Sequence, residues 1–509
     1  MRTEQSIKNS IIAIISNVLT IIIGMIAQTV FLKIMGTEYL GLNSLFSNII
    51  SMLSILELGF GSAMIYNLYK PIAENDKERI KALMKFYKKC YRLIAIAVLI
   101  VGIIILPFIT FFIGDVSVPV NLYLVFGMFV LDSVISYMLT YKRSILYADQ
   151  KTYIINIIHL LYLLIMNLIQ ILILYTTKNY ILYLIIKILC RLFENIVINI
   201  VVNKRYAYLK EKTKKSIDQT TLLEIKQNIK GLFFHKISSY VINSTDNIVI
   251  SKFLGVAMVG MYSNYHMITN ALDILIGQVF SSIVASIGNL FTEKNDKKNI
   301  KNYKNIMFIN FWIATFCTIS FYCIVQPFIV VWLGEKYMLN EYIVLSIAMT
   351  FYFQTMRKTL NSFKEAGGVF YVDRYSALCE AIINIVASIV CVYLFGMAGV
   401  FLGTIISSMY IFIYAYPKYT YTPLFEKSRK EYIMENLKYL IIFIIIGMMT
   451  VLISKIVSFN NYWYQMIYNI IDCLLVPNIL MMLIYRKTEE YMYIKNLAKK
   501  IVEKVRKDK

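Results

Sequence analysis

Three ionisable side chains stand close together in an otherwise apolar stretch, KILCRLFEN. Lys187, Arg191 and Glu194 are spaced by four and three residues, so a helix would present all three on one face. Arg191 lies near the middle of the apolar run 180–203. A guanidinium offers the fork of donors that a phosphate prefers, and a lysine adds a second positive charge. These residues predict a site for an anionic group such as phosphate or pyrophosphate.

A second polar region covers 230–253, where GLFFHKISSYVINSTDNIVISKF is too polar to face lipid on all sides. Lys236 in this run is the third cation that we expect to hold the phosphate. Asp246, and Asp273 in the next run, are the acids expected to bind a coupling ion, H+ or Na+. The other residues expected to line a shared cavity are Asn17, Thr20, Gln28, Glu57, Asp132, His235, Ser239, Asn243, Asn247 and Asn270.

The same charges have a structural interpretation. Arg191 with Glu194, or Lys236 with Asp246, would then pair only to hold helices together. A single ion pair does not explain the polarity of 230–253, however. Polar residues concentrate in equivalent runs of two halves of the chain, which favours a water-filled cavity between the halves. The three histidines are not close in sequence, so no metal site is expected.

The composition predicts an all-α polytopic membrane protein. Of the 509 residues 59% are apolar, the mean hydropathy is +0.63, and a span needs about 20 apolar residues. We expect fourteen spans, at 10–32, 43–66, 90–113, 120–141, 153–176, 180–203, 230–253, 256–288, 305–333, 340–362, 374–396, 398–420, 436–457 and 463–485. The seven cysteines form no CxxC pair and are expected to be buried free thiols.

The net charge of +22 reports topology rather than nucleic-acid binding. If the N-terminus is cytoplasmic, the expected outer loops hold only five of the 52 Lys and Arg residues: Lys33, Lys178, Lys252, Lys336 and Lys455. Most of the others fall in the loops and tails of the opposite side. This positive-inside bias places both termini in the cytoplasm, and the charged tail after Tyr485 is expected to lie along the anionic inner leaflet.

A repeat divides the chain. KIMGTEYLGLNSLF at 33–46 returns as KFLGVAMVGMYSNY at 252–265, and the shared pairs at this offset are Lys33/Lys252, Gly36/Gly255, Gly41/Gly260 and Ser44/Ser263. Each copy ends the first span of a half, so its glycines are expected to form a tight outer turn in which φ is positive. Because each six-helix half begins and ends inside, the two halves form parallel repeats.

The predicted organisation has five parts. They are an N-lobe of six helices at 1–209, a cytoplasmic linker at 210–229, a C-lobe of six helices at 230–421, two appended helices at 422–485 and a basic cytoplasmic tail at 486–509. Gly399 and Gly403 form a GxxxG, which permits close helix packing.

Several activities are disfavoured by what the sequence lacks. It has no ATP-binding loop, no hydrolase or zinc-protease motif and no dinucleotide fingerprint, so it is no primary pump on its own. The short outer loops carry few ionisable residues, which argues against a glycan polymerase or transferase. No cofactor is expected.

Two six-helix lobes, the turn from Leu254 to Ser263 and two extra C-terminal helices resemble the multidrug/oligosaccharidyl-lipid/polysaccharide exporter superfamily. The polysaccharide-export branch, the Wzx-type flippases of lipid-linked oligosaccharides, is most similar. A lipid II flippase of the same superfamily has an arginine in the middle of its first helix, where this chain has Ser16, Asn17 and Thr20. That difference counts against the lipid II branch.

The resemblance implies a flippase in the cytoplasmic membrane of a bacterium. Its substrate would be an undecaprenyl-pyrophosphate-linked oligosaccharide, moved from the inner to the outer leaflet by alternating access without covalent chemistry. Membrane lipids, a polysaccharide polymerase and glycosyltransferases are the expected partners. The alternatives are an ion-coupled exporter of small cationic compounds and, with less support, a membrane glycan polymerase or the lipid II flippase.

Overall fold

The computed structural model describes residues 2–57, 60–113, 118–211, 213, 215, 217–292, 295–367 and 373–507. Helices fill nearly all of these ranges, and no strand occurs within them. Helices satisfy their own backbone hydrogen bonds, which is what a lipid environment demands of an apolar chain. The expected all-α fold class is therefore confirmed.

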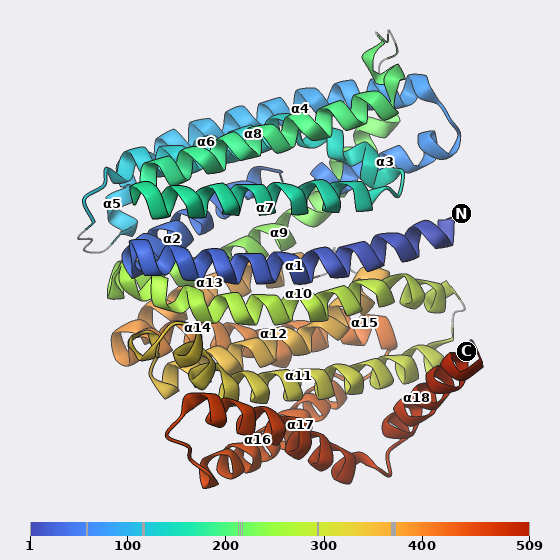
Figure 1. Ribbon diagram of the computed structural model, residues 1–509. Helices are drawn as coiled ribbons and strands as arrows, with labels where there is room; N and C mark the ends of the chain where they lie inside the picture. Colours follow the sequence, from blue (N-terminus) through green and yellow to red (C-terminus); the bar gives the residue numbers. More distant parts are fainter. Residues whose placement is uncertain are drawn as a thin grey trace. The chain divides into compact units, whose positions relative to one another are not determined.

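Long helices connected by short turns or short helical segments make up the fold (Figure 1). The long ones are α1 (Arg2–Met35), α2 (Thr37–Leu53), α3 (Phe60–Ala73), α4 (Lys77–Ile105), α6 (Leu122–Ala148), α7 (Thr152–Thr177), α8 (Tyr180–Arg205), α9 (Gln219–Leu254), α10 (Val256–Thr292), α11 (Asp296–Trp332), α12 (Glu341–Gly367), α13 (Arg374–Phe395), α14 (Met397–Tyr410), α16 (Arg429–Ile456), α17 (Tyr462–Tyr485) and α18 (Glu489–Lys507). The short ones are η1 (Ser54–Glu57), η2 (Leu106–Phe108), α5 (Ile109–Phe112), η3 (Ala207–Lys210), η4 (Glu335–Tyr337), η5 (Ile411–Ala415), η6 (Pro417–Tyr421) and α15 (Thr422–Phe425).

Ten helical segments of the described chain are long and apolar enough to cross a membrane. The other four expected spans coincide with the long helices α8, α9, α10 and α12. The second expected span, 43–66, is corrected by the structure, because it is not one helix. α2 ends at Leu53, η1 follows, and Glu57 accepts a 2.8 Å hydrogen bond from the Tyr91 hydroxyl of α4 before α3 begins.

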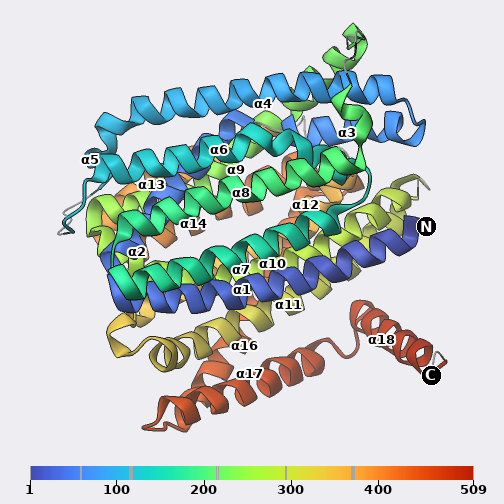
Figure 2. The same cartoon turned by 45° about the horizontal axis from the view of Figure 1, so that its top comes forward.

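Contacts divide the chain into two compact units, Met1–Ser263 and Asn264–Lys509. In the first unit α6 packs against α4 and α8, α7 against α1 and α8, and α9 against α2. Figure 2 shows α4, α6 and α8 running side by side. The two units are defined by contacts between helices, whereas the predicted lobes are defined by the internal sequence repeat. The lobe boundaries stay a prediction.

In the second unit α11 packs against α12, α16 and α17, and α13 packs along α14. The GxxxG of α14 permits close packing against α13, as its spacing predicts. A Cβ on Gly399 would lie 2.0 Å from the Cys391 carbonyl oxygen, and one on Gly403 would lie 2.4 Å from the Ser388 backbone nitrogen. Only glycine lets the two helices approach this closely.

The repeated motif forms two matching turns. Gly36 and Gly255 both have φ of +89°, with ψ near 180°, a conformation almost restricted to glycine. The expected positive φ is thus confirmed at the first glycine of each copy. Each turn joins two long helices, α1 to α2 and α9 to α10.

The second glycine of each copy contacts the other copy. A Cβ on Gly41 would lie 1.9 Å from the Val256 carbonyl oxygen, and one on Gly260 would lie 2.1 Å from the Thr37 carbonyl oxygen. Thr37 and Val256 are themselves equivalent positions of the repeat. The start of α2 therefore packs backbone to backbone against the start of α10, in a reciprocal arrangement.

Serine side chains extend this contact. The hydroxyls of Ser44 and Ser263, again equivalent positions of the repeat, lie 2.6 Å apart. Further along α2, the Ser51 hydroxyl lies 3.0 Å from that of Ser244 on α9. We call the contact of Gly41, Ser44, Gly260 and Ser263 the glycine–serine contact.

Candidate functional site

Glu194 of α8 is the centre of a charged cluster inside the helical bundle. Its side chain is fully buried. One carboxylate oxygen, Oε1, lies 3.1 Å from Arg143 Nη2 of α6 and 2.9 Å from His159 Nδ1 of α7. The other, Oε2, accepts a 3.1 Å hydrogen bond from Arg191 Nη1, one turn earlier on α8. Three helices thus converge on one carboxylate.

Asp132 of α6 is the second acid of the cluster. Its carboxylate lies 3.6 Å from Lys187 Nζ and 3.5 Å from Arg191 Nε. The same two cations also lie over aromatic rings: Lys187 is 4.3 Å from the centre of Phe129 and Arg191 is 4.9 Å from that of Tyr162. Cation–π contact and ion pairing together hold both cations in place.

The cluster carries a surplus of positive charge. Among the described residues, Arg143, Lys187 and Arg191 face two carboxylates, those of Asp132 and Glu194. The side chains of Lys187 and Arg191 are 23% and 20% exposed, so the bundle does not fully enclose this positive charge.

Local sequence signals set the helices in this geometry. Asn121 and Asn179 cap α6 and α8, with their side chains accepting hydrogen bonds from backbone amides of the first turn. Only Lys178, in the left-handed conformation, and Asn179 separate α7 from α8. So short a connection makes α7 and α8 antiparallel neighbours, and it brings His159 against Glu194.

The structure brings together three of the predicted site residues, Arg191, Lys187 and Asp132. The predicted pairing of Arg191 with Glu194 is present, and Arg191 also pairs with Asp132 while its side chain remains partly exposed. Glu57 lies instead beside Tyr91. Asp273 of α10 forms a 2.8 Å ion pair with Lys358 of α12 in the second unit.

The remaining predicted residues lie on three helices. Asn17, Thr20 and Gln28 are half-buried on α1, Asp246 is half-buried on α9, and Asn270 is exposed on α10. Asn247 of α9 is buried, and its amide oxygen has no hydrogen-bond partner among the described residues. The side chains of Lys236, His235, Ser239 and Asn243 lie outside the described residues.

Sequence reasoning missed Arg143 and His159 as members of the cluster. A lone histidine in the apolar run HLLYLLIMN of α7 was the available signal. It also missed a buried pair in the second unit, where Arg357 of α12 donates two hydrogen bonds to Glu380 of α13, one of 2.8 Å. Arg357 Nε donates to the Tyr416 hydroxyl at 3.3 Å as well.

Within the described residues, no group of three or more His, Cys, Asp or Glu side chains is arranged to hold a metal ion.

Solved structures with the same fold are transporters and flippases. The structure titled lipid II flippase MurJ, in an inward closed conformation, has a TM-score of 0.67 at 15% identity and covers 94% of this chain and 99% of its own. An inward-facing MATE-family multidrug resistance transporter has a TM-score of 0.56 at 13% identity, covering 79% and 94%. A Vibrio cholerae MATE transporter, VcmN, has a TM-score of 0.56 at 11% identity, covering 80% and 93%.

This chain therefore shares the fold of these solved structures. The family described as polysaccharide biosynthesis protein matches residues 6–291, more than half of the sequence. The chain belongs to this family, and the expected superfamily and polysaccharide-export branch are confirmed. No curated protein matches the sequence significantly.

Proposed function

We propose that this protein is a flippase for a lipid-linked oligosaccharide. It carries an undecaprenyl-pyrophosphate glycan from the inner to the outer leaflet of a bacterial cytoplasmic membrane, with both termini in the cytoplasm. The observation that carries the proposal is the charged cluster of α6, α7 and α8. Its surplus positive charge and partly exposed cations suit a pyrophosphate.

In the proposed mechanism Arg191 and Lys187 bind the pyrophosphate, and Lys236 assists from α9. Binding exchanges part of the pairing with Asp132 for contacts with phosphate oxygens, so the cations never stand unpaired in the membrane. The polar side chains of α1, α9 and α10 line the path of the glycan. Asp246 or Asp273 binds a coupling H+ or Na+. Glycosyltransferases supply the substrate and a polymerase consumes it.

Export of small cationic compounds is the second candidate, since the MATE transporters share the fold. A cationic substrate needs an acid that is free to receive it. Both acids of the cluster are already surrounded by cations, with Glu194 in contact with Arg143 and Arg191. The charge balance thus favours an anionic substrate.

The glycine–serine contact is proposed to close the outer side of the substrate path. It joins the two copies of the repeat at the ends of α2 and α10 that the charge distribution assigns to the outside. Alternating access requires equivalent helices of the two lobes to separate there when the path opens outward.

Binding of the pyrophosphate is tested with the purified full-length protein in detergent. Arg191→Lys keeps the charge but removes the guanidinium fork, and we expect it to weaken binding of an undecaprenyl-pyrophosphate oligosaccharide about tenfold, as measured by native mass spectrometry. The matched control is Arg357→Lys, which alters the buried Arg357–Glu380 pair of the second unit and should leave binding unchanged. Equal binding by wild type and Arg191→Lys would refute the assigned phosphate site.

A further inference from the structure

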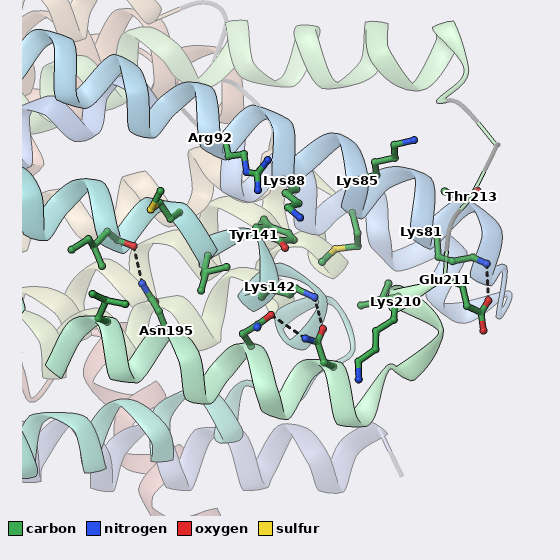
Figure 3. Close-up of a pocket in the computed structure, with 18 residues that line it drawn as sticks. Lys81, Lys85, Lys88, Arg92, Tyr141, Lys142, Asn195, Lys210, Glu211 and Thr213 are labelled. Carbon is green, nitrogen blue, oxygen red and sulfur yellow. Dashed lines mark hydrogen bonds and ion pairs between the residues drawn. The ribbon is translucent and has the colours of Figure 1, made fainter. Parts of the chain in front are cut away.

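A second cationic site lies on the other side of α6 and α8, in a cavity that they form with α4 (Figure 3). Its volume is about 1060 Å³. Four of its cations recur on one face of α4 at helical spacing: Lys81, Lys85, Lys88 and Arg92. Two more come from other elements, Lys142 from α6 and Lys210 from η3. Figure 3 shows Lys88 and Arg92 on the side of α4 that faces Tyr141 and Lys142.

The charge of this cavity is poorly neutralised. Among the described residues that line it, Glu211 is the only acid, and it pairs with Lys81 at 3.0 Å; Glu78 also pairs with Lys81. Lys142 is buried and donates a 2.6 Å hydrogen bond to a neutral side chain, the amide oxygen of Asn203. The four other cations, Lys85, Lys88, Arg92 and Lys210, form no ion pair with any carboxylate in the described ranges. Burial of a lysine without an acid favours a bound anion.

The lining changes from charged to apolar along the helices. Lys81 stands in the first turns of α4, and Lys210 follows the end of α8. Towards the middle of α6 and α8 most of the lining residues are apolar, namely Ile135, Met138, Leu139 and Leu192, with the polar Asn195 beside them. The charged end lies on the side that the sequence assigns to the cytoplasm. A ligand that fits must have an anionic head and a hydrocarbon tail.

We propose that this cavity binds the phosphate head group of a lipid from the inner leaflet. Lys88, Arg92 and Lys142 contact the phosphate, and the hydrocarbon chain extends toward Met138 and Leu192. Basic pockets between membrane helices on the cytoplasmic side hold anionic head groups through charge and hydrogen bonds. The phosphate belongs either to an anionic membrane phospholipid or to a polyprenyl carrier, and the inference does not rest on the proposed flippase activity.

The site is separate from the Glu194 cluster but shares a wall with it. Asn195 of α8 lines the cavity, donates a 2.8 Å hydrogen bond to the Ile135 carbonyl, and receives one of 3.4 Å from Arg143. The two sites therefore lie on opposite sides of the contact between α6 and α8. Variants of Lys88 and Arg92 leave the cluster of Arg191 and Glu194 untouched.

The test compares two double variants with the same net charge. Lys88→Gln/Arg92→Gln removes two cations of the cavity. The control is Lys89→Gln/Lys204→Gln. It removes two exposed cations that do not line the cavity, one next to Lys88 on α4 and one in the last turn of α8. Purified full-length proteins are titrated in detergent with dioleoylphosphatidylglycerol, with undecaprenyl diphosphate and with inorganic pyrophosphate, and bound ligand is counted by native mass spectrometry.

For at least one of the two lipids we expect wild type and control to bind the same number of molecules and the Lys88→Gln/Arg92→Gln variant to bind one fewer, because the Arg191 cluster is unchanged in all three proteins. Loss of phosphatidylglycerol binding identifies a membrane phospholipid as occupant, and loss of undecaprenyl diphosphate binding alone identifies the carrier. Equal loss in the control would overturn the proposal, because bulk charge would then explain the binding. Inorganic pyrophosphate binding as tightly as either lipid would also overturn it.

Discussion

A Ser44→Cys/Ser263→Cys variant is expected to form a disulfide under oxidation and to lose glycan export completely while the bond persists. The two hydroxyls lie 2.6 Å apart, so cysteines at these positions fall within the range of a disulfide. The bond would join α2 to α10 at the glycine–serine contact and prevent the outer side from opening. The measurement is export of surface glycan by cells that express the variant, before and after treatment with oxidant.

Recovery of export after treatment with reductant would show that the disulfide, rather than the substitutions or oxidative damage, causes the loss. Each single cysteine variant should export normally with oxidant, and reductant should restore export to the double variant. The seven native cysteines are free throughout the described chain, so they are retained in all variants. Full export by the oxidised, cross-linked protein would contradict the proposal that the glycine–serine contact must separate during transport.

Replacing Glu194 is expected to destabilise the protein more than replacing any surface acid. Glu194→Leu leaves Arg143, Arg191 and Lys187 in the bundle with only Asp132 as a counter-charge. Breaking a buried pair from one side costs about 3–5 kcal/mol, because the remaining charge is uncompensated. The measurement is the midpoint of thermal unfolding in detergent, which should fall by several degrees.

A surface pair provides the matched control for this prediction. Glu341 lies 3.3 Å from Lys455, and both side chains are more than half exposed. Glu341→Leu should change the midpoint very little, because exposed pairs contribute less than about 1 kcal/mol. If Glu194→Leu melts at the same temperature as Glu341→Leu, the cluster is not the electrostatic centre that its geometry indicates.

Sequence periodicity predicted which residues share a helix face, and it did so without the structure. Lys187 and Arg191 lie together because their spacing is helical, and both reach Asp132. Arg143 and His159 could not be assigned to this cluster, because packing of α6 and α7 against α8 depends on tertiary contacts. The turn glycines Gly36 and Gly255 were predictable for the opposite reason: positive φ is a local requirement.

Two features show where local patterns stop being informative. The repeat identified Gly41 and Gly260 as equivalent, yet their mutual contact arises only when the start of α2 packs against the start of α10. The basic residues from Lys81 to Arg92 were interpreted as a signal of topology alone. Only the packing of α6 against α4, and of α8 against α6, turns their stripe into a cavity.

Lipid translocation in proteoliposomes is the direct test of whether this chain is a flippase. The purified protein is reconstituted with an undecaprenyl-pyrophosphate oligosaccharide that carries a fluorophore on the glycan, and a membrane-impermeant quencher is added outside. Wild type is expected to make the inner-leaflet fluorophore accessible, and Arg191→Lys and the oxidised Ser44→Cys/Ser263→Cys variant are expected to do so far more slowly. Quenching no faster with wild type than with protein-free liposomes would contradict the proposal that this chain is a flippase.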